Sequence, residues 1–339
     1  MAILGNVISV GKGSGSDVSC VVKINTSPNA TVTAYLGSNS ITATANSTGL
    51  ATLTLKKEGL WTITSTDGKS TNSVTLNVAF SYTVNQDCKL IGTLNETPWS
   101  LIKQVSELGQ MSNYWGVGDC KAVTINGTVG TQKFNNETFY CFIIGADHNK
   151  SVEGSGIHFQ FGKSALTGGV DLAFADSNYG YSNNSSYKMC SENTNTGGWS
   201  GSYMRNTICT AFLAALPEDL RSVISACTKY TDNTGGDSSK ASNVTTTSDK
   251  IWLLAEFEVF GTRKSANSAE QNYQKQYSYY SSGKSTIKYQ SNSRSSAAMW
   301  WLRSPVNNDA SRFCLVKQDG TAYFAFNSTT YSFAPCFKV

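Results

Sequence analysis

The amino-acid sequence predicts a mostly β protein of the α+β class, on the basis of composition, residue alternation and turn chemistry. Only 15% of the 339 residues are charged, and Pro occurs five times, whereas Ser, Thr, Asn and Gly are abundant. This composition is typical of strands joined by polar turns. Aromatic residues reach 11%, which is too high for a disordered chain. The net charge of +4 is too small to indicate a nucleic-acid partner or a polybasic membrane-binding surface.

Apolar and polar residues alternate through the first part of the chain, for example in Val18–Ile24 and Val74–Val78. A period of two residues indicates strands with one buried face. Turn signals separate these runs, and Asp67-Gly68 is a candidate hairpin turn. We therefore expect a small β-sandwich at residues 1–80, followed by a linker and a first strand at 81–95. The segment resembles the immunoglobulin-like modules of bacterial surface and phage structural proteins.

Residues 96–339 combine helix and strand signals. Thr97-Pro98 precedes an apolar run and predicts a helix with Thr97 as the N-cap and Pro98 at the first position. Further helices are expected at 206–216 and from Pro217 to Ile224. Strands are expected at 139–144, 157–161, 251–257, 299–303, 313–317, 321–326 and 333–339. A few helices among many short strands predict an α+β domain.

The sequence offers few residues for catalysis. It holds only two histidines, His148 and His158, and none of the common nucleophile, phosphate-binding or dinucleotide-binding motifs. Cys141 and His148 could imitate a thiol–imidazole pair with Asp147 to orient the ring. Cys141 lies in an apolar strand pattern, however, where burial makes a thiol inert. We therefore expect no enzymatic activity, no cofactor and no metal site.

Cysteine usage and the first residues of the chain bear on localisation. The nine cysteines are scattered without a Cys-x-x-Cys pair, which argues against a zinc site and against a dense disulfide framework. We expect mostly buried thiols. Residues 1–10 lack the pattern of a signal peptide, and no run of about 18 apolar residues is present. We therefore expect neither signal-directed export nor membrane insertion.

Large apolar anchors and short polar side chains alternate towards the end of the sequence. We expect a buried frame, made of Trp300, Trp301, Arg303, Pro305, Phe313, Pro335 and Phe337. Between these anchors lie the residues that we expect to touch a ligand, called here the contact set: Val306, Asn307, Asn308, Asp309, Ser311, Arg312, Lys317, Gln318, Tyr323, Phe324, Phe326, Thr329 and Tyr331. A rigid frame with adaptable polar and aromatic side chains is how a paratope is built. The alternative is that the contact set consists of ordinary exposed loop residues.

Tyrosines are concentrated between positions 273 and 289. Tyr273, Tyr277 and Tyr280 have helical spacing, so they could pack one helix face onto the core. Together with Tyr279 and Tyr289 they could equally form a second binding surface, because Tyr supplies a large contact area. Both interpretations remain open at this point.

Several motifs resemble those of an uncharacterised domain family of gut bacteria and their phages. They include TPWSLI at 97–102, GGWSGSYMRNTIC at 197–209, DKIWLLAEFEVFG at 249–261, WWLRSP at 300–305, FCLV at 313–316 and FAPCF at 333–337. That family is similar to the C-type-lectin fold shared by formylglycine-generating enzymes and by the variable proteins of diversity-generating retroelements. The resemblance implies a C-type-lectin-like ligand-binding domain at 96–339, with mutable positions displayed on a C-terminal face at 299–339. The calcium-dependent sugar motifs of such lectins, Glu-Pro-Asn and Trp-Asn-Asp, are missing.

The resemblance and the missing signal peptide together predict a phage virion protein of the tail or tail fibre. Its C-terminal loops would act as a receptor-binding surface for host adhesion, with a bacterial surface protein or glycan as the ligand. We also expect contacts with other phage structural proteins and a homo-oligomer, a trimer by analogy. The first alternative is a virion decoration or baseplate protein without a host ligand. The second is an enzyme of the formylglycine-generating type, which would require redox-active thiols such as Cys314 and Cys336.

Overall fold

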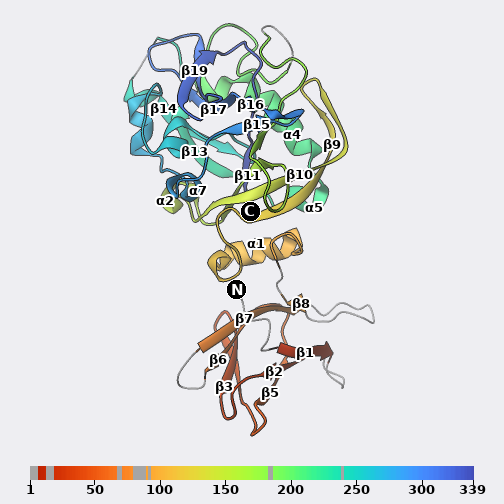
Figure 1. Cartoon of the computed structure of the whole chain (residues 1–339). Coiled ribbons are helices and arrows are strands. Elements are labelled where there is room, and N and C mark those ends of the chain that lie inside the picture. Colours follow the sequence, from red (N-terminus) through yellow and green to blue (C-terminus); the bar gives the residue numbers. More distant parts are fainter. Residues whose placement is uncertain are drawn as a thin grey trace. The chain divides into compact units, whose positions relative to one another are not determined.

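The structure, a computed structural model, describes residues 7–12, 19–66, 71–78, 89–90, 93–181, 186–237 and 240–339. The chain divides into two compact units, one of Met1–Thr97 with Ser112–Tyr114 and one of Pro98–Met111 with Trp115–Val339. Among the described residues, those in strands clearly outnumber those in helices. The prediction of a mostly β protein of the α+β class is therefore confirmed (Figure 1).

The N-terminal unit consists of two antiparallel sheets. The three-stranded sheet has the order β1-β2-β5 and the five-stranded sheet the order β4-β3-β6-β7-β8. The strands are β1 (Val7–Lys12), β2 (Cys20–Asn25), β3 (Thr31–Leu36), β4 (Asn39–Thr44), β5 (Leu50–Leu55), β6 (Gly59–Thr66), β7 (Thr71–Val78) and β8 (Lys89–Leu90). The Asp67-Gly68 turn and most of the expected linker at 81–95 lie outside the described residues.

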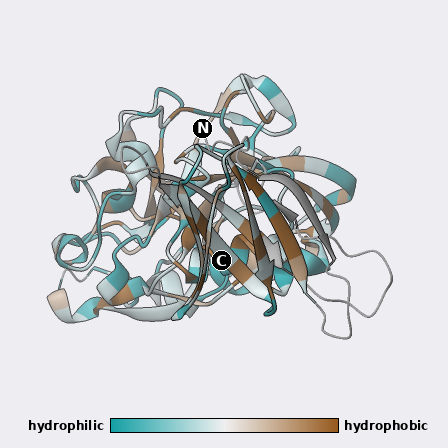
Figure 2. Cartoon of the chain, turned by 90° about the horizontal axis from the view of Figure 1, so that it is seen from below, coloured by the Kyte–Doolittle hydropathy of each residue, from teal (hydrophilic) through white to brown (hydrophobic). Residues whose placement is uncertain are grey.

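Both sheets contribute to one hydrophobic core. Val22 and Leu53 from the three-stranded sheet belong to the same buried cluster as Val32, Trp61 and Leu76 from the other. In β2 the buried side chains alternate with more exposed ones, as the period of two predicts. Figure 2 shows this alternation as hydrophobic and hydrophilic bands along strands.

The C-terminal unit is organised around a four-stranded antiparallel sheet with the order β20-β11-β10-β9. A second sheet, β12-β15-β16, contains the parallel pair β12 and β15, and a third sheet has the order β17-β18-β19, while β13 and β14 form a two-stranded ladder. The strands are β9 (Cys120–Val129), β10 (Gln132–Ala146), β11 (Ile157–Lys163), β12 (Leu172–Ala173), β13 (Cys227–Asp232), β14 (Val244–Asp249), β15 (Lys288–Gln290), β16 (Ser293–Ala298), β17 (Trp300–Pro305), β18 (Arg312–Val316), β19 (Ala322–Phe326) and β20 (Cys336–Lys338).

The helices are short, apart from α1. They are α1 (Trp99–Glu107), α2 (Lys150–Glu153), α3 (Gly198–Gly201), α4 (Thr210–Ala215), α5 (Glu218–Arg221), α6 (Glu256–Phe260) and α7 (Ser278–Ser281), with the 3-10 helices η2 (Met111–Asn113), η4 (Ala241–Asn243) and η5 (Ser268–Asn272) and the π-helix η3 (Met204–Cys209). No helix in the described part of the chain is long and apolar enough to cross a membrane.

Aromatic side chains from distant parts of the sequence join these elements. The Phe212 ring of α4 packs edge-on against Phe161 and Phe174, with 5.1 Å between ring centroids in each pair. The Phe337 ring of β20 lies 5.4 Å from Phe161. The last strand is thus packed into the core of the unit as well as hydrogen-bonded to β11.

Two local predictions are wrong. Residues 251–257 do not form a strand, because α6 begins at Glu256, and its first turn is closed by a hydrogen bond from the Ala255 backbone to the Glu258 carboxylate. All residues of this segment except the half-buried Phe257 are buried, so its apolar run does not distinguish a strand from a helix. In α1 the N-cap is Pro98 rather than Thr97. The Thr97 hydroxyl donates instead to the carbonyl of Thr93, 2.8 Å away.

Most cysteines in the described part of the chain are buried thiols, as expected, with two exceptions. Seven are free there, and all of these except the half-buried Cys120 are buried. Cys20 is disulfide-bonded.

Candidate functional site

Most residues of the frame and the contact set lie in the sheet β17-β18-β19 or in the loops that join its strands. Four lie outside it: Thr329, Tyr331 and Pro335 follow β19, and Phe337 belongs to β20 of the four-stranded sheet. All six residues of β17 are buried, and so are four of the five residues of β18. The edge strand β19 differs, because every one of its residues is at least partly exposed. The sheet therefore has an exposed strand supported by two buried ones.

Arg312 of β18 packs against two aromatic rings of β19. It lies opposite Phe326 in the strand register, and its guanidinium carbon is 4.7 Å from the Phe326 ring centroid and 5.3 Å from that of Phe324. Its Nη1 donates to Asp309 at 3.1 Å. Such cation–π contacts contribute about 0.5–1 kcal/mol at exposed sites. Arg312 is therefore held in place although it remains partly exposed.

Tyr323 and Lys317 continue this row of cations and rings. The Tyr323 ring is parallel to that of Phe324, with 5.2 Å between centroids, and Lys317 Nζ lies 5.6 Å from the Tyr323 ring centroid. Tyr323 is 42% exposed and Phe326 is 48% exposed. Exposed aromatic residues flanked by ordered cations are typical of binding surfaces.

The polar loop before β18 is held by Asn195, a buried residue far upstream. The Asn195 side-chain amide donates to the carbonyls of Asp309 and Arg312, at 2.5 and 2.9 Å. Its backbone N–H donates to the carbonyl of Ala310 at 2.6 Å. The loop backbone is thus fixed by hydrogen bonds while its side chains stay accessible. Asn195 was not among the predicted residues, because nothing local in the sequence distinguishes it from the many other asparagines.

The structure places the two predicted groups in different environments. All seven residues of the frame are buried, and all thirteen residues of the contact set are partly or fully exposed. Within the frame, the buried Arg303 is held by a carboxylate, because it forms a two-point hydrogen-bonded ion pair with Glu258.

Three of the clustered tyrosines are core residues. Tyr277, Tyr279 and Tyr280 are at most 4% exposed, whereas Tyr273 is 41% exposed. The Tyr280 hydroxyl donates to Gln160 at 2.6 Å, which satisfies the polar end of a buried ring. The packing interpretation, made for Tyr273, Tyr277 and Tyr280, therefore holds for Tyr277 and Tyr280 and is wrong for Tyr273. The three residues do not share one helix, because Tyr273 follows η5 and Tyr280 lies in α7.

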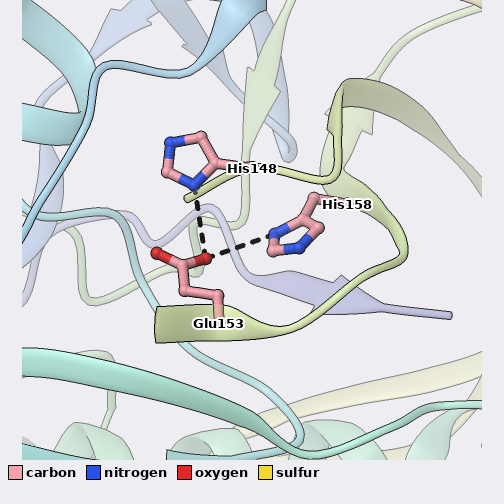
Figure 3. Close-up of side chains that lie close together, drawn as sticks. All are labelled: His148, Glu153 and His158. Carbon is pink, nitrogen blue, oxygen red and sulfur yellow. Dashed lines mark hydrogen bonds and ion pairs between the residues drawn. The ribbon is translucent and has the colours of Figure 1, made fainter. Parts of the chain in front are cut away.

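Both histidines lie beside one buried carboxylate. Glu153 of α2 points its Oε2 towards His148 Nδ1 at 3.3 Å and His158 Nδ1 at 3.6 Å (Figure 3). The potential ligand atoms of these three residues lie within 4.8 Å of one another, and all three residues are buried. The equal spacing of five residues, at 148, 153 and 158, is the signal that could have suggested the cluster. β10 ends at Ala146, shortly before α2, and β11 begins at Ile157, shortly after it, and pairs with β10. His148, Glu153 and His158 therefore lie at the same end of the β10–β11 pair.

A buried lysine lies beside the same carboxylate. Lys229 Nζ donates to the same Glu153 oxygen at 2.7 Å, to Glu258 at 3.2 Å and to the Tyr277 hydroxyl at 2.8 Å. Burial favours a neutral Glu153, but Lys229 and His148 outweigh it and hold the pKa of Glu153 below its usual value. Burial and the Lys229 charge lower the pKa of His158 well below its usual value. The arrangement therefore suits a buried ion network better than a metal centre.

The same network reaches the frame. Glu258 is shared by Lys229 and Arg303, and Arg303 also donates to the Thr231 hydroxyl at 2.6 Å and to the carbonyl of Leu253 at 2.8 Å. Burial opposes the charge on Glu258, but Arg303 and Lys229 lower its pKa. The alternating charges from Glu153 to Arg303 thus fasten β17 to α6 and β13.

The thiols considered for chemistry are in separate, inert settings. Cys141 Sγ faces the carbonyl of Lys121 at 3.6 Å, while His148 is bonded to Glu153. Burial raises the pKa of Cys314 well above its usual value, and it also raises the pKa of Cys336. Both thiols are free and fully buried, which is the opposite of the exposed thiolate that redox chemistry requires.

Comparison with known proteins gives one match. Residues 175–339, which include η3, β13, the frame and the contact set, are similar to a family described as a domain of unknown function, DUF6273. No curated protein matches the chain, and no solved structure matches it.

Proposed function

We propose that this chain is a phage virion protein, associated with the tail or tail fibre, that binds a bacterial surface ligand through the contact set. The observation that carries the proposal is the division of the last strands into a buried frame and an exposed face. Such a face can change its side chains without disturbing the core that supports it. The resemblance to retroelement-diversified proteins supports the same function.

Four exposed or partly exposed side chains, called here the exposed row, supply the anchors for this binding: Arg312, Lys317, Tyr323 and Phe326. Tyr323 and Phe326 offer large rigid surfaces, and Arg312 and Lys317 offer cations beside them. Aromatic residues and Arg are enriched among the residues that dominate binding energy. If each site binds with modest affinity, several copies on one particle would still give a high overall avidity.

The experiment replaces Arg312, Tyr323 and Phe326 by Ser and measures how the labelled protein binds to host cells. We expect cell binding to fall at least about tenfold, because each residue removed is of the type that dominates interfaces. The matched control is Tyr35→Ser, since Tyr35 is 44% exposed in the N-terminal unit. Both proteins must retain their circular dichroism spectra and thermal transitions. A folded triple variant that binds host cells as the unchanged protein does would overturn the proposal.

The binding of the unchanged protein to host cells and to phage particles distinguishes the main alternative. A virion decoration or baseplate protein would use the exposed row to contact another phage protein. In that case, the unchanged protein would fail to bind host cells but would bind to particles that lack it. Copy number in purified particles provides the second measure, because decoration proteins greatly outnumber tail-tip proteins.

Sequencing of the gene in sibling phage isolates tests the diversification that we propose. We expect substitutions to be concentrated in the codons for 306–338 at adenines, with Trp300–Pro305 and Pro335 unchanged. An even distribution of substitutions would contradict diversification without affecting the binding proposal.

A further inference from the structure

A cavity of about 220 Å³ lies outside the contact set and the frame. One wall comes from η3 and α4, and the other comes from the end of β14 and the two residues that follow it. None of the lining residues takes part in the proposed receptor binding. The cavity is therefore a separate candidate site.

The helix that lines the cavity has an unusual form. η3 (Met204–Cys209) is a π-helix that continues directly into α4. π-helical turns are rare, and they occur frequently at functional sites. Here the π-helix supplies Arg205 and Asn206 to the cavity wall.

Arg205 is held in one orientation by a carboxylate beneath it. Its Nε donates to Asp249 Oδ1 at 2.7 Å, and its Nη1 donates to Asn206 Oδ1 at 3.1 Å. The buried Asp249 is itself fixed, because its Oδ2 accepts bonds from Trp199 Nε1 at 3.0 Å and from the Thr247 hydroxyl at 2.6 Å. Arg205 Nη2 has no hydrogen-bond partner among the described residues. Two N–H donors of a pre-oriented guanidinium thus remain available.

The cavity has a net positive charge and one apolar side chain on each wall. Asp249 balances Arg205, whereas Lys250 is exposed and has no ion-pair partner in the described part of the chain. Leu213 and the buried Ile251 line the same space. An anion with a short hydrocarbon chain matches both features. The volume is below the 300–1,000 Å³ that is typical for drug-sized ligands, so the ligand must be small.

We propose that this cavity binds a small aliphatic carboxylate. The carboxylate accepts from Arg205 Nη2 and from Lys250, and the hydrocarbon chain packs on Leu213 and Ile251. Guanidinium–carboxylate hydrogen bonds are charge-assisted and stronger than neutral ones. Leu213 and Ile251 favour a carboxylate with a carbon chain over an inorganic oxyanion, which would leave these two side chains without a contact.

The test is a titration of the full chain with butyrate at constant ionic strength, followed by calorimetry and ligand-observed NMR. We expect saturable binding, and we expect Lys250→Gln to weaken it about fivefold, the effect of losing one partly exposed ion pair. Arg205→Gln should weaken it more strongly. The matched control is Lys284→Gln, because Lys284 is also exposed but does not line the cavity. If Arg205→Gln fails to fold, Lys250→Gln still decides the question, since its side chain is exposed.

Three results would overturn the proposal. The first is that butyrate shows no saturable binding. The second is that Lys250→Gln and Lys284→Gln weaken binding equally, which would indicate non-specific attraction. The third is that inorganic phosphate binds as tightly as butyrate and displaces it, which would identify a site for bare oxyanions. None of these results affects host-cell binding by the contact set, so the two proposals fail separately.

Discussion

Arg303 of β17 and Glu258 of α6 are joined at two points in the interior of the C-terminal unit, and both side chains are completely buried. The same Glu258 carboxylate accepts from the Ala255 backbone N–H at 3.0 Å, which closes the first turn of α6. One carboxylate thus serves a strand and a helix at once. Loss of either charged partner should therefore disturb both elements.

We expect Arg303→Met to lower the free energy of unfolding of the C-terminal unit by about 3–5 kcal/mol, because a buried carboxylate loses its main partner. Urea unfolding followed by tryptophan fluorescence measures this change. The control is Glu107→Gln, which breaks the exposed pair with Lys103 on α1 and should cost less than about 1 kcal/mol. A loss below about 1 kcal/mol for Arg303→Met would contradict the role given to this pair.

Lys288 should make stability depend on pH in the alkaline range. Its Nζ is buried without a hydrogen-bond partner among the described residues, 3.8 Å from Asp171, and burial lowers its pKa to about 8. The folded state thus disfavours the charged lysine, and the penalty is present in full below pH 8. It is relieved as the pH rises from about 8 towards the unfolded value near 10.5.

Lys288→Met removes this penalty, and it should therefore stabilise the protein below pH 8, by up to about 3 kcal/mol. The difference between the variant and the unchanged protein should shrink between pH 8 and 10.5. Thermal unfolding across this range provides the measurement, with the exposed Lys284→Met as the control. A difference that does not vary with pH would show that Lys288 carries no such penalty.

Gly162 of β11 should be irreplaceable for reasons of space. A Cβ at this position would lie 1.9 Å from the backbone oxygen of Leu172, and the φ angle is +112°. We expect Gly162→Ala to destabilise the unit by about 2–4 kcal/mol, since both steric overlap and backbone strain oppose it. Gly116→Ala is the matched control, because nothing lies within 4 Å of a Cβ there. Equal melting temperatures of the two variants would refute this expectation.

The free thiols should differ in reactivity in the native protein. Cys120 is half-buried, and burial raises its pKa to about 11, so it should react slowly with Ellman's reagent at pH 8. The other six, Cys141, Cys190, Cys209, Cys227, Cys314 and Cys336, are buried and should react only after denaturation. A rapid reaction of any of these six in the native state would argue against their burial. The denatured protein provides the reference for full reaction.

The sequence predicted those features that rest on local patterns. The alternation in Val18–Ile24 correctly indicated β2, and the anchors around Trp300 correctly indicated buried strands. The prediction for 251–257 was wrong, because a largely buried segment has a similar apolar composition whether it forms a helix or a strand. The helix there depends on Glu258, whose partner Arg303 lies 45 residues further along.

The buried charged network could not be predicted for the same reason. Glu153 and Lys229 are 76 residues apart, and charged residues are usually exposed. Single-sequence patterns carry no information about such pairs. The two histidines are conspicuous in the sequence because there are only two, whereas Glu153 is one of many acidic residues. Only the tertiary structure reveals that Lys229 lies beside the Glu153 carboxylate.

The hydrogen bonds that fasten the loop before β18 have a consequence for how this face can evolve. The Asn195 side-chain amide donates to the backbone carbonyls of Asp309 and Arg312, and the Asn327 N–H donates to the carbonyl of Ser311. These bonds are made to the backbone of the loop. They therefore depend on the number of residues in the loop and hardly at all on the side chains of those residues. The face should therefore accept amino-acid exchanges freely but reject insertions and deletions, so that lineages diverge here in chemistry while keeping one loop length.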